Sequence, residues 1–288
     1  MSSLKRNLGL AAAAVGVGAA SLAVVLSQVK SVRRSHARGA ARMALVRGSE
    51  AAAAGHYGLA EERYREGLAA GADRAVTMNL IGVALRAQGR YEEAVTAYDD
   101  SLAAGDERAS VHTNRGNALR ALGRREEAER CYRLSIEIDP GYPRAYCGLA
   151  RAAEHRGDFA RAARHYREAV ERGLAPSRAA PWIYLALARS GDPQPEKALR
   201  PGIESQGFER SVAEFLAGTL SPMRLLAKAG SRGEYATRAR YYMGMRFLLE
   251  GNREAALEQL LKAVRLKRCN SAEYAAAMCE IERLANSD

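Results

Sequence analysis

The sequence predicts an all-α protein, a helical solenoid of repeated helix pairs preceded by one N-terminal transmembrane helix. Small and aromatic residues recur every 34 positions within 41–176, and 22 residues from Leu8 to Val29 carry no charge. The chain is 48% hydrophobic but only 6% aromatic, so small side chains must build its core. We therefore divide it into 1–40, 41–176 and 177–288.

Residues 1–40 are predicted to be a membrane anchor with a basic flank. As a helix, the run at about 8–29 would extend roughly 33 Å, enough for a hydrocarbon core of about 30 Å. The run is apolar on every side, which excludes an amphipathic surface helix. It is longer than the apolar region of a cleaved secretory signal, whereas an Arg-rich mitochondrial presequence still fits it. Whether this segment is retained or cleaved stays open.

Flanking charge predicts the orientation and the compartment. Two basic residues precede the apolar run and five follow it by Arg42, so the positive-inside rule places the body of the protein in the cytosol. We expect the inner membrane in a bacterium and the mitochondrial outer membrane in a eukaryote, with a periplasm-facing body as the minor alternative. Seven of the 44 Lys and Arg residues, and no acid, lie in 1–42, which leaves a net charge of only +4 beyond it. A nucleic-acid-binding body is therefore not predicted.

A 34-residue repeat organises the middle of the chain into the units 41–74, 75–108, 109–142 and 143–176. Each unit reads as two short helices separated by a glycine turn. In the second unit, Gly82 and Ala94 let the two helices approach closely, and Tyr98 fills the space toward the next pair. The same step relates Gly55, Gly89, Gly123 and Gly157, then Ala60, Ala94, Ala128 and Ala162, and finally Tyr64, Tyr98, Tyr132 and Tyr166.

This small–small–aromatic pattern, together with Pro140 in Ile-Asp-Pro, resembles the tetratricopeptide repeat (TPR) family. The resemblance implies a right-handed solenoid whose first helices line a concave groove for a protein or peptide. The groove positions are the second, fifth, sixth, ninth and twelfth of each first helix. They hold Asn79, Arg86, Asn114, Asn117, Arg120, Arg144 and Arg151, with His155 beside them.

The chemistry of these groove residues favours a peptide that bears a carboxylate. Asparagine can pair with a peptide backbone as donor and acceptor, and arginine forks suit carboxylates. An ordinary solvated polar face is the alternative. The carboxylate clamp of chaperone-reading members of the family is matched only by Asn114 and conservatively by Arg144. Its other places hold Asn79, Val83 and Gly148, so recognition of a chaperone C-terminus is not predicted.

The final third, 177–288, is expected to be irregular. Six of the eight prolines crowd into 176–222, too many for a continuous helix pair. A degenerate fifth repeat keeps Gly191 and Ala198, and a sixth repeat extends from Tyr242 to Ala263. A capping helix at about 271–285 would start at a box of Asn270 and Glu273. The order Pro-Trp-Ile-Tyr-Leu, Val-Ala-Glu-Phe-Leu-Ala-Gly and Tyr-Tyr-Met-Gly is similar to bacterial TPR adaptors of the lipoprotein type, although no lipid-attachment cysteine is present.

No catalytic or cofactor-binding motif appears in the sequence. There is no Walker A loop, no GxSxG elbow and no HExxH, and the five histidines are too scattered to share a metal. The four cysteines form no CxxC and suit a reduced protein as small apolar residues, with two disulfides as the alternative. Paired acids are expected to favour the N-terminal dipoles of the second helices rather than to act in catalysis. These pairs are Glu61/Glu62, Glu92/Glu93 and Glu126/Glu127.

The sequence therefore predicts a membrane-anchored, non-catalytic TPR adaptor that binds a protein or peptide in its concave groove. It predicts no enzyme activity, cofactor, metal, nucleic acid or small-molecule substrate. A mitochondrial outer-membrane import receptor or co-chaperone-like docking module is the first alternative. A regulatory subunit of a membrane-associated enzyme is the second.

Overall fold

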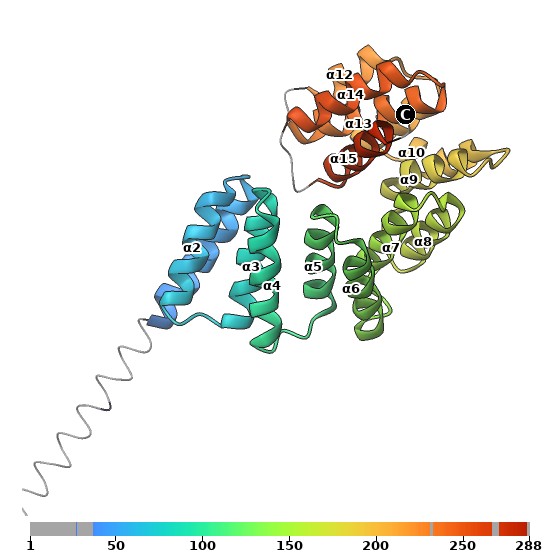
Figure 1. The fold of residues 1–288 in the computed structure, drawn as a ribbon. Helices are drawn as coiled ribbons and strands as arrows, with labels where there is room; N and C mark the ends of the chain where they lie inside the picture. The colour runs from blue at the N-terminus through green and yellow to red at the C-terminus, as the bar shows by residue number, and fades with distance from the viewer. Residues whose placement is uncertain (1–26, 28–36, 231–232, 267–270, 287–288) are drawn as a thin grey trace, which may run out of the picture. The chain divides into compact units, whose positions relative to one another are not determined.

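The computed structural model describes residues 27, 37–230, 233–266 and 271–286, and every regular element in them is a helix (Figure 1). The predicted anchor at 8–29 lies outside these residues apart from Ser27. Among the helices that are described, none combines the length and the apolar character needed to cross a bilayer.

The chain divides into two compact units, Met1–Thr77 and Met78–Asp288. In the first unit, a helix at 37–53 packs against α2 (Tyr57–Ala69). A methyl group added at Gly48 would lie only 2.5 Å from Tyr64 Cε1, so this glycine gives the aromatic ring the room it needs. Glu61 and Glu62 lie beyond the first turn of α2, so the predicted dipole role is wrong for this pair.

Helix pairs follow one another through the first part of the second unit. They are α3 (Arg74–Ala87), which begins just before the boundary, with α4 (Tyr91–Ala103), then α5 (Ala109–Ala121) with α6 (Arg125–Ile138), and α7 (Pro143–His155) with α8 (Phe159–Glu171). Glycines at φ of 75–80° make the turns within the pairs, at Gly89, Gly123 and Gly157. Side chains with a Cβ rarely adopt this conformation, which explains the recurring glycine. In α4 and α6 the acidic pairs do lie in the first turn.

A buried tyrosine joins the pair of α5 and α6 to the pair that follows it. Tyr132 has no exposed surface, and a methyl group at Gly116 would lie 2.7 Å from its Cε1. A methyl group at Gly148, in the following pair, would lie 2.5 Å from Cδ1 of the same ring. The ring therefore fills the space between α5, α6 and α7. The predicted all-α solenoid is confirmed, and this contact packs two of its neighbouring pairs together.

The prolines break one helix and spare another. Contrary to expectation, α9 (Pro176–Arg189) continues through Pro181. The second helix of the degenerate fifth repeat is instead replaced by a 3₁₀ turn, η1 (Pro195–Leu199), and the four-residue α10 (Arg200–Ile203). Proline removes a helix donor and its ring crowds the preceding turn, so this segment, which contains three prolines within 193–201, cannot form one long helix.

Five further helices complete the second unit: α11 (Gly207–Leu216), α12 (Pro222–Ala229), α13 (Gly233–Leu249), α14 (Arg253–Arg265) and α15 (Ala272–Ala285). The N-cap of α15 is Ser271, whose Oγ accepts a hydrogen bond from Tyr274 N. The predicted capping box is therefore not formed as expected. Its Asn270 lies outside the described residues, and Glu273 forms an ion pair with Arg238 at 3.1 Å.

An aromatic cluster forms the centre of the core where α13 packs on α9. The Trp182 ring lies 5.3 Å from the Tyr241 ring and 6.1 Å from the Tyr166 ring, centroid to centroid. Apolar side chains of α15, including Ala277 and Ile281, pack against the same core. The C-terminal helix is thus part of the folded body of this unit.

Candidate peptide-binding face

The eight predicted groove residues lie on α3, α5 and α7, and we name the surface that they form the groove face. At its α3 end, the side chains of Asn79 and Asn114 contact each other, with Nδ2 of Asn114 donating to Oδ1 of Asn79 at 3.3 Å. Asn79 is only 8% exposed. These two amides link neighbouring repeats and are partly used within the protein.

Arg86 and Arg120 lie beside the buried tyrosines of their own repeats. Burial raises the pKa of Tyr98 to about 12, although the neighbouring Arg86 favours the phenolate. Burial likewise raises the pKa of Tyr132, whose hydroxyl donates to Asn117 Oδ1 at 3.1 Å. Within the described part of the chain, the buried Nε atoms of Arg86, Arg120 and Arg151 have no hydrogen-bond partner. The groove face therefore holds donors that the fold does not satisfy.

A charged cluster lies where α7 meets α8 and α9. Tyr166 Oη donates to Glu154 Oε2 at 3.2 Å, and the guanidinium of Arg151 lies 5.6 Å from the centre of the Trp182 ring. Burial raises the pKa of Glu154 to about 7, while Arg151 opposes the rise. Near neutral pH both the neutral and the charged form of this carboxyl are therefore populated, and it offsets the positive charge of Arg151 only in part.

A cavity of about 380 Å³ opens beside this cluster, and we name it the groove pocket. Arg144 and Arg178 on its wall are exposed, and neither has an ion-pair partner among the residues that the structure describes. Arg238 is committed to Glu273 at 3.1 Å and to Glu209 at 3.2 Å. The pocket is lined by Asn117, Arg144, Cys147, Arg151, Tyr166, Leu174, Arg178, Trp182, Glu234, Arg238, Ser271, Ala272 and Glu273.

The acidic helix α15 covers another part of the groove face. Glu282 of α15 pairs with Arg125 at 3.1 Å, and its Oε2 lies 3.9 Å from Nε2 of the predicted groove residue His155. Arg283 Nη2 donates to the backbone oxygen of Glu154 at 2.5 Å. Burial and the nearby Arg125 lower the pKa of His155, so this ring is neutral at neutral pH.

Comparison with known proteins identifies the repeats. Residues 45–109 and 107–174 each match a family model described as tetratricopeptide repeat. The chain is a TPR protein. No curated protein matches its sequence. In the part that is described, no group of three or more His, Cys, Asp or Glu side chains could hold a metal ion.

Several solved structures share its fold at low identity. PilF of Pseudomonas aeruginosa is 18% identical with a TM-score of 0.54, and the match covers 86% of this chain and 99% of that one. A TPR protein of Parabacteroides merdae is 16% identical with a TM-score of 0.52, covering 83% and 99%. A chain of the APC/C hetero-tetramer Cut9-Hcn1 is 13% identical with a TM-score of 0.55, covering 85% of this chain and 42% of that one.

The TPR fold brings together only some of the predicted groove residues. Asn117, Arg144 and Arg151 line the groove pocket, whereas Arg120 and His155 line a separate cavity beside α15. Asn79 and Asn114 contact each other, and Arg86 stays with Tyr98. Sequence reasoning missed Arg178 and Trp182 of α9 and the helices that close the pocket. The Pro-Trp-Ile-Tyr-Leu stretch was the available signal for Trp182, but the 34-residue register gave no reason to place it beside Arg151.

Proposed function

We propose that this TPR protein is a non-catalytic adaptor that holds a carboxylate-bearing peptide segment of a partner protein in the groove pocket. TPR repeats are protein-binding scaffolds, so a protein partner is the first expectation. The observation that carries the proposal is a set of three arginines, Arg144, Arg151 and Arg178, around one cavity of about 380 Å³. Arg144 and Arg178 have no ion-pair partner among the described side chains.

The charge balance of the groove pocket favours an anionic group. Of its two acidic side chains, Glu273 is engaged by Arg238 at 3.1 Å, which leaves Glu234 as the one carboxylate on the described wall against the cations Arg144, Arg151 and Arg178. Arg151 lies deeper, and its buried Nε has no hydrogen-bond partner among the described residues. A carboxylate that enters between these side chains would accept charge-assisted hydrogen bonds. The half-buried amide of Asn117 could hold the adjoining backbone, since its Oδ1 already accepts from Tyr132 and its nitrogen stays free to donate.

The apolar wall of the groove pocket supports a peptide rather than a simple anion. The Trp182 ring and the side chain of Leu174 line the same cavity as the arginines. Such a wall accepts an apolar side chain next to the carboxylate, which is the usual composition of a specific site. We therefore infer that the ligand has an apolar residue beside a C-terminal carboxylate or an acidic side chain.

The test uses a random peptide library displayed with free C-termini and selected on the full chain. We expect the selected peptides to carry an acidic residue or a required terminal carboxylate. Each charged hydrogen bond contributes about 1.5–3 kcal/mol, so the double variant Arg144→Ala/Arg178→Ala should weaken their binding at least about tenfold. Thermal melting should hardly change, because exposed charges contribute little to folding.

The matched control is Arg124→Ala, an exposed arginine in the turn before α6 that pairs with Glu127 at 2.6 Å. It should leave peptide affinity unchanged. Equal losses in the control and in the double variant would contradict the proposal. Selected peptides that bind the double variant as well as the parent chain would show that the partner docks elsewhere.

We further propose that the adaptor works at a membrane surface, in the cytosol-facing orientation that the flanking charges favour. The support is the uncharged run from Leu8 to Val29 and the basic residues that follow it. Attachment to a membrane would restrict a bound partner to two dimensions and so raise its local concentration.

A further inference from the structure

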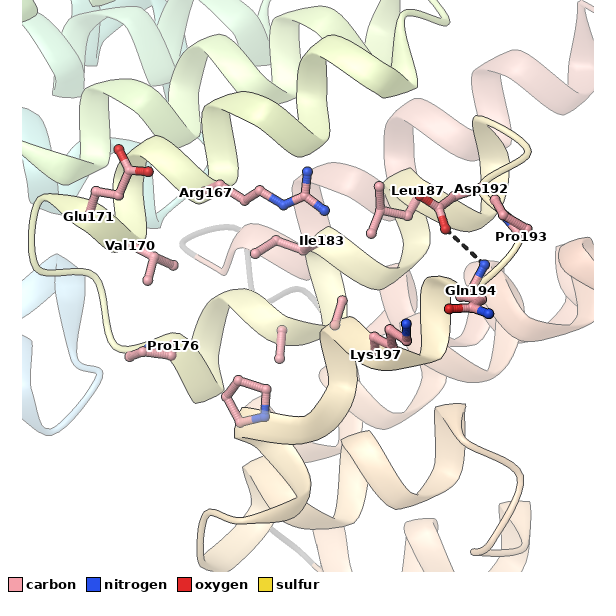
Figure 2. A pocket seen from close by; sticks show the side chains of 13 residues that line it. Arg167, Val170, Glu171, Pro176, Ile183, Leu187, Asp192, Pro193, Gln194 and Lys197 are labelled. Carbon is pink, nitrogen blue, oxygen red and sulfur yellow. Dashed lines mark hydrogen bonds between the residues drawn. The ribbon is translucent and has the colours of Figure 1, made fainter.

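A second cavity of about 670 Å³ lies between α8, α9, η1 and α10, and we name it the proline pocket (Figure 2). It shares no lining residue with the groove pocket. Val170, Ile183 and Leu187 form much of its surface, and Pro176, Pro193 and Pro201 stand around them. Cavities of about 300–1,000 Å³ with mainly apolar walls and a few polar groups are typical of small-ligand sites.

The broken second helix of the fifth repeat creates this cavity. A regular repeat would place a continuous helix against α9, as α8 lies against α7. Here the chain instead makes a loop, η1 and the four-residue α10. Leu199, which is fully buried, and Gly202, whose absent side chain lets α10 approach Ala213, fix this short segment to the core. Buried contacts therefore fix the segment that forms this wall of the proline pocket.

Two cationic side chains line the cavity. Arg167 of α8 and Lys197 of η1 line it, and the side chain of neither forms an ion pair or hydrogen bond with any residue that the structure describes. Figure 2 shows the Arg167 side chain extending across the cavity above Ile183, while Glu171 stands at the opposite end of the same helix segment. Of the two carboxylates on the wall, Asp192 accepts from Gln194 N at 2.8 Å and Glu171 pairs with Arg172 at 3.7 Å, and among the described residues neither forms an ion pair with Arg167 or Lys197. An anionic group is therefore favoured near Arg167 and Lys197.

The backbone around the proline pocket offers little to a peptide. Three of the lining residues are prolines, which have no N–H. The loop amides are engaged, with Asp192 N donating to Leu187 O at 3.1 Å and Lys197 N donating to Gln194 O at 3.3 Å. Amides inside α9 serve the helix itself. A peptide would bring its own N–H and C=O groups and find few partners for them, which is costly in an apolar cavity.

We propose that the proline pocket binds a single-chain amphiphilic carboxylate, the chemistry of a fatty acid, with its apolar chain against Ile183 and Leu187 and its carboxylate at Arg167 and Lys197. Such a ligand has one anionic acceptor group and no backbone amides. It matches a cavity that has apolar walls and two unpaired cations. This site is independent of the peptide site in the groove pocket.

The test uses a twelve-carbon fatty acid that carries a photoreactive diazirine in its chain, added to the full-length protein and mapped by mass spectrometry. We expect labelling to concentrate on α8 and α9 residues that line the cavity, such as Val170 and Ile183. Unlabelled dodecanoate should compete, whereas dodecylammonium, which has the opposite charge, should compete at least tenfold more weakly. The double variant Arg167→Gln/Lys197→Gln should reduce labelling at least tenfold, since each lost charged contact is worth about a factor of ten or more.

Two further variants distinguish binding in this cavity from nonspecific binding of the fatty acid to the protein surface. Ala198→Phe fills the cavity without changing its charge and should also block labelling. Arg164→Gln/Lys228→Gln removes the same charge from exposed side chains that do not line the cavity, and it should leave labelling intact. Thermal melts should confirm that each variant is folded. Labelling outside the cavity, labelling unaffected by Arg167→Gln/Lys197→Gln, or equal competition by dodecylammonium would each overturn the proposal. Arg144→Ala/Arg178→Ala, which changes the groove pocket, should leave this labelling unchanged. A failure of the proposed peptide site can therefore be distinguished from a failure of the fatty-acid site.

Discussion

Replacing Gly148 with alanine tests the contact that stacks the TPR repeats. The added methyl group would lie 2.5, 2.6 and 2.7 Å from Cδ1, Cε1 and Cγ of Tyr132. Real Cβ atoms do not approach this closely, so the ring or a helix must move. The ring cannot move away from the added methyl group, because it is fully buried and also lies against Gly116. Its hydroxyl is held as well, since it donates to Asn117 Oδ1 at 3.1 Å.

The expected magnitude combines two opposing effects. Overpacking a well-packed core costs about 1–3 kcal/mol. Alanine is a better helix former than glycine by about 1 kcal/mol, which offsets part of that loss. The matched control is Gly39→Ala, because Gly39 is helical and has no atom within 4 Å of the new methyl group. The packing cost is therefore the difference between the two variants, about 1–3 kcal/mol in the free energy of unfolding.

The assay is urea unfolding of the full-length chain followed by far-UV circular dichroism, with thermal melts alongside. Because repeat proteins can unfold in parts, midpoints and slopes should be compared together. A second variant, Tyr132→Leu, removes the ring, so that Gly148→Ala should cost less in its background. If Gly148→Ala is as stable as Gly39→Ala, or if its cost is the same with and without the ring, the contact between repeats is not as described. Affinity of selected peptides should also fall, since Tyr132 holds Asn117 of the groove pocket.

Two predictions concern the charged core and the N-terminal segment. The pKa of Glu154 rises from 4.5 to about 7 on folding, so the folded state favours the protonated form, and stability should fall as pH rises from about 4.5 to 7 by at most about 3 kcal/mol. In urea titrations at several pH values, Glu154→Gln should flatten this dependence of stability on pH. Glu137→Gln, at an exposed position, should leave the dependence unchanged. If Glu154→Gln shows the same pH dependence as the parent chain, the raised pKa of Glu154 is refuted. Deleting residues 1–34 should release a soluble, helical protein from carbonate-washed membranes, and persistent sedimentation of the truncated chain would show that the anchor proposal is wrong.

The repeats could be predicted from the sequence because their contacts are local. Gly82, Ala94 and Tyr98 lie within 17 positions of one another, and the same three-part contact returns every 34 residues. A helix face has a fixed period, so spacing alone indicates which side chains must meet between the two helices of a pair. The turns at Gly89, Gly123 and Gly157 follow for the same reason, since only glycine adopts their φ without strain.

The candidate site was predicted only in part. The groove positions of α3, α5 and α7 followed from the repeat register, but their partners did not. Arg283 contacts Glu154 across 129 positions of sequence, and Arg125 pairs with Glu282 across 157. No period connects such residues. As a result, the sequence showed eight groove residues as one set. The structure separates them into a pocket, a surface beside α15, the amide pair of Asn79 and Asn114, and Arg86 beside Tyr98.

By itself, the sequence determined the helical solenoid, its repeat unit and the place where that unit fails. Only the tertiary structure decided what the failure produced. The prolines within 193–201 forbid a long helix, yet nothing local to them dictates that η1 and α10 leave a cavity beside Arg167 and Ile183. The groove pocket likewise exists because α13 and the start of α15 close over Arg151 and Trp182. Helix formation follows from interactions a few residues apart, whereas the shape of a cavity depends on small packing energies summed over segments that are distant in sequence.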